Sequence, residues 1–347
     1  MGLDEQLERL KRDLESLGSL EQVEESNDSY ISVHREITLF REPEFFVIER
    51  GVEGYKMGFV DGGNHPFFSY GPIMLELNRL AHSVYRGVDR CSRHGPYSFL
   101  SFTFLAQQEV KTKIYGDKLA FMPEELGVRK TGLGQAFETV RLGGRARRIM
   151  ELNYASYIVN EGLIDALILD GNLGHGNDDA ELVSLAELFN ACQRSRVTIV
   201  GFAKRTSLMV GGLPVTYFVD REARRKGFDY YSALIGKALR GDPSRSGHAE
   251  TLLFVVKLSS RGVKPYLIEV AYAPDPESLL GALAENSTNM YAPGYPLGLV
   301  EVDRMARIQT TVEGKLLKLK LQQHLRDSPL LGEGLAHELL DVFNGSV

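Results

Sequence analysis

The chain has 347 residues and a formal net charge of −6 at pH 7. This length allows a large buried core, and we expect one large α/β domain with appendages rather than several domains. The mildly acidic balance argues against a protein that coats nucleic acid through its overall field, but it does not exclude local basic patches. No apolar run approaches the roughly 20 residues that span a bilayer, and the first residues are charged rather than signal-like, so we expect a cytoplasmic protein without membrane contact.

The first 25 residues carry leucines separated by steps of four and three, with charged residues between them. These are Leu3, Leu7, Leu10, Leu14 and Leu17. The heptad-like spacing predicts a helix over residues 1–25, which either packs on its own domain or serves dimerisation or partner docking. Residues 26–29, Ser-Asn-Asp-Ser, break the pattern and predict a linker.

From Phe45 onward, apolar runs alternate with helical stretches, as expected for α/β architecture. The predicted strands cover residues 45–49, 56–61, 97–106, 165–170, 197–203, 251–257 and 266–272. The predicted helices include residues 179–192 and 277–285. Because the early strands follow one another closely and the later ones are separated by helices, we expect a mixed sheet, antiparallel at first and parallel later.

The chain contains two cysteines, Cys91 and Cys192. They lie far apart and lack the spacing of metal ligands, so neither a disulfide framework nor a zinc site is indicated. We expect both to be buried, reduced thiols.

Two aspartates each follow an apolar run and precede a glycine. Asp61 ends the run Lys56-Met-Gly-Phe-Val before Gly62 and Gly63, and Asp170 ends the run Ala166-Leu-Ile-Leu before Gly171. Ligands of open α/β sheets gather outside the carboxyl ends of parallel strands, and a glycine there lets the chain turn sharply. Each pattern alone is typical of an ordinary turn, but two carboxylates in this position indicate a metal site.

Residues 143–158 predict a helix that leads into the strand before Asp170. Glu151 shares a face of this helix with apolar and aromatic residues one turn away, so we expect it to point inward. A buried glutamate needs a partner, which is either Arg147 or Arg148 in an ordinary ion pair or a divalent metal. Carboxylate oxygens suit Mg²⁺ or Mn²⁺, and two such ions about 4 Å apart stabilise both the attacking and the leaving oxygen of a phosphodiester.

Near the C-terminus, residues 294–296, Gly-Tyr-Pro, predict the start of a helix with proline in its first turn. Asp303 falls about two turns later on the apolar strip of that helix and is a further candidate for the interior. The alternative is an ion pair with Arg304 or Arg307 on a solvated face, and the spacing does not decide between the two.

Basic residues form three clusters in the sequence. The clusters are Arg141 with Arg145, Arg147 and Arg148; Arg221 with Arg224, Arg225 and Lys226; and Arg240 with Arg245. The aromatic stretch Phe228–Tyr231 beside the second cluster is of the kind that stacks bases. One hypothesis is a channel for a single strand of DNA, and the alternative for each cluster is a solvated helix face.

Several short motifs follow one another in a fixed order. They are Asp61 in Val-Asp-Gly, Glu151 on a helix, Asp170 in Leu-Asp-Gly-Asn-Leu, Lys204 in Gly-Phe-Ala-Lys-Arg-Thr, and Tyr295 in Gly-Tyr-Pro. In this order, between Lys56 and Ile308, the chain resembles the NurA nuclease family. The resemblance implies a ribonuclease-H-like fold, a mixed sheet flanked by helices, over residues 40–325, with the helix over 1–25 before it and a helical tail over 326–347 after it.

The resemblance also implies a function. The family consists of manganese-dependent nucleases that cut DNA ends and single strands beside a HerA-type hexameric ATPase during end resection. It thus implies 5′–3′ exonuclease and single-strand endonuclease activity in recombinational repair, on single-stranded DNA and duplex ends. Mn²⁺ would be the cofactor, with Mg²⁺ as a substitute, and the assembly would be a homodimer.

By the same resemblance, Asp61, Glu151 and Asp170 would be the metal-binding acids, and Tyr295 would lie at the edge of the active site. Lys204 would neutralise the scissile phosphate or orient the nucleophile, and the alternative is a surface lysine at a strand exit.

The chain departs from the family at Asp303, where many archaeal members carry a histidine. An aspartate can ligate Mn²⁺ or Mg²⁺, so we expect Asp303 to be a further metal ligand, but it cannot donate a proton at neutral pH unless its pKa is strongly raised. His175, between two glycines after Asp170, is an alternative proton donor, or else an ordinary exposed histidine.

The sequence has no serine-elbow or catalytic-cysteine motif, which fits hydrolysis by metal-bound water, and no phosphate-binding loop, so any ATP-driven movement would come from a partner. Two other functions stay open. One is a non-catalytic DNA-binding adaptor subunit of an ATPase complex. The other is a metal-dependent phosphatase of small substrates, although the arginine clusters favour a polymer.

Overall fold

The computed structural model describes residues 37–50, 54–70, 73–106, 109–130, 143–174, 178–206, 208–210, 212–242, 247–308, 310–317 and 319–320. The predicted helix over 1–25, the linker over 26–29 and the tail over 326–347 lie outside the described residues. The same holds for Arg141, His175 and Arg245.

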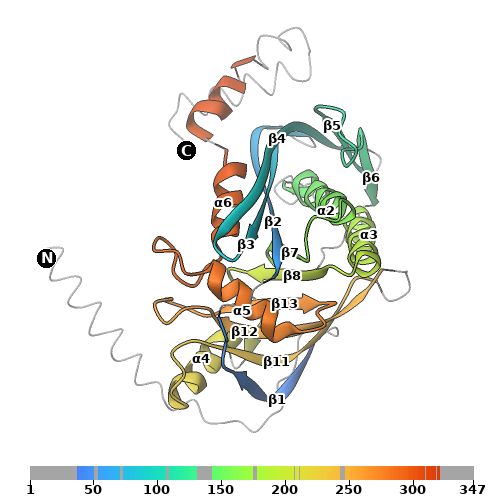
Figure 1. Ribbon diagram of the computed structural model, residues 1–347. Coiled ribbons are helices and arrows are strands. Elements are labelled where there is room, and N and C mark those ends of the chain that lie inside the picture. The colour runs from blue at the N-terminus through green and yellow to red at the C-terminus, as the bar shows by residue number, and fades with distance from the viewer. Residues whose placement is uncertain are drawn as a thin grey trace, which may run out of the picture.

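A single eleven-stranded sheet forms the frame of the described chain (Figure 1). Its strands, from edge to edge, are β1 (Ile37–Phe46), β11 (Tyr231–Arg240), β12 (Ala249–Lys257), β13 (Tyr266–Ala271), β8 (Thr198–Ala203), β7 (Ala166–Asp170), β2 (Lys56–Tyr70), β3 (Ile73–Arg86), β4 (Asp89–Ala106), β5 (Glu109–Tyr115) and β6 (Glu125–Lys130). Two short strands, β9 (Met209–Val210) and β10 (Leu213–Pro214), form a separate hairpin.

The sheet is mixed, as predicted. Strands β2, β7 and β8 run parallel at its centre, and every other pair of neighbours is antiparallel. The prediction of a parallel later half is wrong, because β11, β12 and β13 follow one another antiparallel. These strands are joined by short loops, whereas parallel pairing requires a longer crossover connection.

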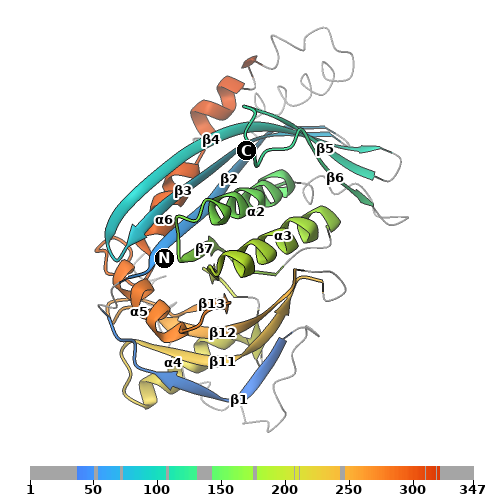
Figure 2. The ribbon, with the colours of Figure 1, turned by 45° about the vertical axis from the view of Figure 1, so that its right-hand side comes forward.

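Helices cover both faces of this sheet (Figures 1 and 2). The helices are α2 (Arg145–Asn160), α3 (Asp179–Ser195), α4 (Val215–Arg225), α5 (Pro276–Asn286), α6 (Leu297–Ala306) and a π-helical turn at Thr310–Gly314. Helices α2 and α3 pack together on one face of the central strands, while α5 and α6 pack on the other face. Helix α4 packs against the sheet near β11 and β12. No described helix combines the length and the apolar character that crossing a membrane requires.

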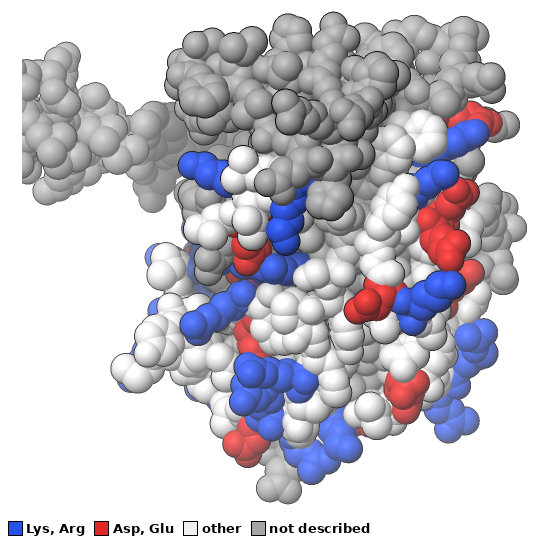
Figure 3. All heavy atoms as spheres, turned by 90° about the horizontal axis from the view of Figure 1, so that it is seen from above, with Lys and Arg blue, Asp and Glu red and all other residues white. Residues whose placement is uncertain are grey.

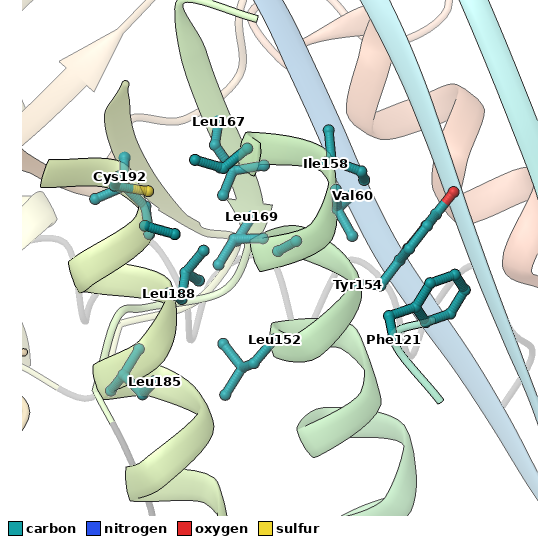
Figure 4. Packing of buried hydrophobic residues seen from close by; sticks show 14 of the residues in the cluster. Val60, Phe121, Leu152, Tyr154, Ile158, Leu167, Leu169, Leu185, Leu188 and Cys192 are labelled. Carbon is teal, nitrogen blue, oxygen red and sulfur yellow. The ribbon is translucent and has the colours of Figure 1, made fainter. Parts of the chain in front are cut away.

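The central strands are buried on both sides, which explains their continuous apolar sequence. In β7, Leu167 and Leu169 pack towards α2 and α3, where they meet Leu152 and Leu188 (Figure 4). Ile168, between them, belongs to the core beneath α5 and α6. Burying such a side chain contributes about 1.5–3 kcal/mol each, so these two cores fix β7 firmly between the helical layers.

Strand β2 continues past the point predicted for its end. The prediction stopped the strand at Asp61 because two glycines follow, but Gly62 and Gly63 stay paired with β3. These glycines permit close packing rather than a turn. A Cβ atom on Gly63 would lie 2.2 Å from the carbonyl oxygen of Ala306, at the end of α6.

One of the two cysteines differs from the prediction. Cys192 is buried in α3, but Cys91 is exposed because it lies near the turn between β3 and β4. Neither forms a disulfide.

Candidate metal centre

Three carboxylates from distant parts of the sequence meet at the centre of the sheet. Asp61 comes from β2, Asp170 from the end of β7, and Asp303 from α6. Each offers one oxygen atom, and these three oxygens lie within 4.8 Å of one another. The structure thus brings together three of the four acids that the sequence predicted as metal ligands.

The pairing of the central strands explains why Asp61 and Asp170 meet. Parallel pairing between β2 and β7 ends at Val60 and Leu169, so the next residue of each strand is one of the two aspartates. Two residues earlier, the side chains of both strands belong to the core beneath α5 and α6. Because side chains alternate along a strand, the aspartates point to that same face.

Helix α6 brings the third carboxylate to this face. The helix can approach β2 because its Gly298 has no side chain: a Cβ atom there would lie 2.1 Å from the ring of Phe59. Leu299 and Val302 are buried against the sheet, while Asp303 keeps a side-chain exposure of 37%. Asp303 is therefore the one of the three carboxylates that lies nearest to solvent.

Lys204 and Tyr295 border the carboxylates, as predicted. Lys204 Nζ donates to Asp170 Oδ2 at 2.6 Å and lies 3.6 Å from Asp303 Oδ1. Burial lowers the pKa of Lys204, but the hydrogen bond to Asp170 and the charges of the three aspartates outweigh it, so the pKa is raised and the ammonium is favoured. The Tyr295 hydroxyl donates to Asp170 Oδ1 at 3.5 Å.

Glu151 is the predicted acid that lies outside this group of three. It is fully buried on α2, and it pairs with Arg147 at 2.8 Å and with Arg148 at 3.1 Å. The carboxylate reaches the sheet from the α2 side, since a Cβ atom on Gly62 would lie 3.3 Å from its Oε2. Both arginines considered in the sequence, Arg147 and Arg148, therefore pair with Glu151. Glu151 also lies close enough to Asp61 for its charge to raise the pKa of Asp61.

Burial and neighbouring carboxylates oppose ionisation at this site. Burial, together with the charges of Glu151 and Asp170, raises the pKa of Asp61 to about 8. Burial and the nearby aspartates also raise the pKa of Tyr295, so its hydroxyl stays protonated and able to donate. Closely spaced, partly buried carboxylate oxygens are the donor set that suits a hard divalent cation. The residues present fit such an ion, and the donor set is equally suited to Mn²⁺ and Mg²⁺.

The sequence left two alternatives for Asp303, a place among the inward-facing carboxylates or an ion pair with Arg304 or Arg307. The structure shows features of both. Its Oδ1 faces the carboxylate group and Lys204, while its Oδ2 accepts from Arg307 Nη2 at 2.8 Å. Because the side chain of Asp303 is partly exposed, one of its oxygens can face the site while the other accepts from Arg307 on the surface.

In the first and third basic clusters, one described arginine each is buried in an ion pair within the fold. Arg145 is buried in an ion pair with Asp178, and Arg240 is buried in a bidentate pair with Glu269. Both arginines hold elements of the fold together, which leaves them unable to contact DNA. In Figure 3, Lys and Arg side chains form separate groups with acidic side chains between them, not one continuous basic surface.

The second cluster stays at the surface, but its aromatic neighbours do not. Tyr231 is fully buried and donates to Asp220, and Phe228 stacks on Phe45 with ring centroids 5.6 Å apart. The predicted base stacking by the stretch Phe228–Tyr231 is therefore wrong at these two rings, which pack in the core under α4.

Two residues beside the site were missed in the sequence. Tyr266 begins β13, and its ring centroid lies 5.6 Å from that of Tyr295. Lys264 Nζ donates to the carbonyl oxygen of Lys204 at 2.9 Å. The segment Lys-Pro-Tyr precedes an apolar run, but only the antiparallel pairing of β13 with β8 places it at the site.

The fold and the site together define a mixed α/β protein with a carboxylate group suited to a divalent metal. Among solved structures, the chain is similar to the NurA nuclease from Sulfolobus solfataricus, with 12% identity, a TM-score of 0.56, and coverage of 95% of this chain and 99% of that chain. The fold of the chain is thus NurA-like, and the resemblance noted in the sequence is confirmed. No protein-family model and no curated protein matches the chain.

Two further solved structures have lower TM-scores. The catalytic domain of human endonuclease V has 14% identity, a TM-score of 0.38, and coverage of 79% of this chain and 83% of that chain. Endonuclease V of Ciona intestinalis, in complex with a 24mer DNA containing an inosine followed by a ribo-adenosine, has 12% identity, a TM-score of 0.35, and coverage of 76% and 87%.

Proposed function

We propose that the protein is a metal-dependent deoxyribonuclease that hydrolyses phosphodiester bonds on a ribonuclease-H-like fold. The observation that carries this proposal is the meeting of Asp61, Asp170 and Asp303 within 4.8 Å in a chain with a NurA-like fold. The central strand order β4-β3-β2-β7-β8, in which β3 alone runs against the others, supports the ribonuclease-H-like assignment.

The three aspartates would hold the ion, with Glu151 as the ligand of a second ion. A bound divalent cation supplies an activated water and stabilises the leaving oxygen. Lys204 would bind a non-bridging phosphate oxygen, since its ammonium already lies among the ligands. The protonated Tyr295 hydroxyl would hold Asp170 in the orientation required for ligation.

The finer parts of the proposal come from the family resemblance. We propose 5′–3′ exonuclease and single-strand endonuclease activity, Mn²⁺ as the preferred ion, and a role in DNA end resection and recombinational repair. The proposed assembly is a homodimer beside a HerA-type hexameric ATPase, with the leucine pattern over residues 1–25 as a contact.

A second candidate function is a non-catalytic DNA-binding adaptor. The observation that favours it is the set of ion pairs already present at the site: Lys204 with Asp170 at 2.6 Å and Arg307 with Asp303 at 2.8 Å. Such pairs stabilise carboxylates without a metal. A cleavage assay separates this function from the first.

The test uses end-labelled single-stranded DNA with Mn²⁺, Mg²⁺ or EDTA. For the nuclease we expect cleavage by the wild type with a metal only, and a loss of about 10³-fold in Asp170→Asn, equivalent to about 4 kcal/mol of transition-state stabilisation. Asp117→Asn, at an exposed aspartate, is the control and should cut normally. A folded wild type that binds DNA but does not cut it, even with its ATPase partner, would establish the adaptor instead.

A further inference from the structure

A pocket of about 550 Å³ opens beside the candidate metal centre and shares Lys204 with it. Its walls come from the end of β8, from β10 and the first turn of α4, and from the start of β13. The volume lies within the range of pockets that hold small organic ligands. The pocket is therefore large enough for one nucleotide next to the scissile phosphate.

The pocket presents apolar side chains to solvent. Tyr217, on α4, is 52% exposed, and Leu213 and Val263, which also line the pocket, are 40% and 91% exposed. A half-exposed tyrosine at the mouth of a pocket offers its ring as a flat contact surface. Such a ring is the usual partner of an unstacked base in proteins that bind single strands.

Three cations, Lys204, Arg205 and Lys264, line the pocket with these apolar side chains. The one carboxylate in the lining, that of Asp220, is already paired with Arg224 at 2.7 Å. Arg205 is exposed and has no ion-pair partner among the residues that the structure describes. Lys264 Nζ lies 5.3 Å above the ring of Tyr266, which in turn packs on Tyr295 of the metal centre. The pocket wall and the metal centre thus share a continuous set of contacts.

We propose that this pocket binds one unstacked base of a single-stranded DNA, with the base on the ring of Tyr217 and the adjoining phosphates on Lys204 and Arg205. The inference rests on the proposed function and adds the means of strand selection. A base in an intact duplex must first leave its stack and its partner, which costs a few kcal/mol, whereas a base in a single strand does not have to leave a partner. The pocket therefore favours single strands and unpaired ends over duplex interiors.

The test measures binding in EDTA, where no cleavage interferes. The probes are a fluorescein-labelled deoxythymidine oligonucleotide and one of equal length built from abasic units. We expect Tyr217→Ala to weaken binding of the deoxythymidine probe about tenfold and to leave the abasic probe unchanged, because stacking requires a base. Tyr217→Phe, which keeps the ring, should bind within about twofold of the wild type, and Arg205→Ala should weaken both probes.

The matched control is Tyr115→Ala, since Tyr115 on β5 is 53% exposed but lies outside the pocket. Equal losses for both probes in Tyr217→Ala, or no loss in either, would overturn the base-binding pocket. A wild type without preference for the probe that carries bases would overturn it as well. Failure of the proposed function is a separate result: base-dependent binding in EDTA with no cleavage in Mn²⁺ would refute the nuclease and leave the pocket in place.

Discussion

Asp61 is a buried carboxylate at the candidate metal centre whose surroundings disfavour its charged form. Its side chain is 6% exposed and lies near two other carboxylates, whose charges oppose its ionisation along with burial. A cation would relieve that repulsion. Closely spaced, buried carboxylates commonly lower the stability of a fold, and such a loss is tolerated where they serve a functional site.

The first prediction follows from this repulsion. At pH 7 without metal, Asp61 is ionised in the unfolded chain but mostly protonated in the folded protein, because its folded pKa is raised to about 8. Asp61→Asn keeps the shape of the side chain and removes the cost of this proton uptake, so it should raise the free energy of unfolding by about 1 kcal/mol. With Mn²⁺, the wild type should gain about 2.7 kcal/mol at a hundred times the dissociation constant, and the variant much less. Thermal unfolding in EDTA and in a Mn²⁺ series measures both effects. A wild-type melting temperature indifferent to Mn²⁺ would contradict the metal centre.

His82 is a buried histidine on β3 that we expect to lower stability in acid. It is 8% exposed on β3, with Nδ1 against the hydroxyl of Tyr154 and its ring stacked on His94 at 4.7 Å. Burial and the nearby His94 lower the pKa of His82 to about 4 from 6.5. Between these values the unfolded chain binds a proton that the folded protein does not, so stability falls as the pH drops through this window.

A substitution tests this assignment. From pH 7 to pH 5, the wild type should lose about 1 to 2 kcal/mol of unfolding free energy through His82, and His82→Gln should not show that part of the loss. Urea unfolding at the two pH values gives the difference. His248→Gln, at an exposed histidine, serves as control and should keep the full pH dependence.

At the scale of elements, strands with a continuous apolar run could be predicted, whereas a buried strand with polar positions could not. Strands β7 and β8 were found within one residue of their ends, because both faces are covered and every position except Asp170 and Thr198 is apolar or glycine. Strand β3 was missed because several of its buried positions are polar. Glu76, Asn78 and Ser83 are all fully buried there, so neither an apolar run nor an alternation marks this strand.

Helix α4 was missed although its signal is present. Val215, Val219 and Ala223 are its buried apolar residues, at steps of four. Arg221 lies among them and Arg224 and Arg225 directly follow, so charged residues mask the apolar spacing in the sequence. Helix α5, whose N-cap Asp275 accepts from the backbone of Ser278 before an apolar helix, was found within one residue at each end.

At the site, too, the residues with a local sequence signal could be predicted, and the packing between distant segments could not. Asp61 and Asp170 could be found because each follows an apolar strand, and this signal is local. The approach of α6 could not be found, because it depends on Gly298 meeting Phe59, residues far apart in the sequence. The sequence predicted this helix and placed Asp303 on its apolar strip, but it did not predict that the helix packs against β2.

Gly298 is therefore the position where helix packing can be tested. In Gly298→Ala the new Cβ atom would overlap the fully buried ring of Phe59, so α6 must move. We expect a loss of about 3 kcal/mol in unfolding free energy. Because Asp303 moves with the helix, cleavage should fall about a hundredfold at a temperature where the variant is folded. Urea unfolding and the cleavage assay measure the two effects.

A double variant separates this overlap from a general weakening of the helix. Phe59→Leu removes the ring, so the cost of Gly298→Ala should be smaller in its presence, with a coupling of about 1 kcal/mol or more. Gly174→Ala is the control, since its Cβ atom would come no closer than 3.4 Å to any neighbour. Additive losses in the double variant would mean that the close approach is not the cause.

For the whole molecule, the main consequence of the fold is that one site joins three segments separated by more than a hundred residues each. Asp61, Asp170 and Asp303 belong to β2, β7 and α6, which meet through strand pairing and packing and not through nearness in the sequence. A ligand held by all three stabilises them only when all are in place. Their local opening should then become coupled when the ligand binds.

Hydrogen exchange of the full chain with and without Mn²⁺ measures this coupling. We expect slower exchange around Asp61 in β2, at the end of β7 and in α6, and no change in α4 and β12, which lie away from the carboxylates. Asp61→Asn should lose the protection in all three segments at once, because removing one ligand weakens binding at the shared site. Protection confined to α6 would mean that Mn²⁺ binds Asp303 at the surface alone, and that the carboxylates at the sheet centre serve the fold through their ion pairs.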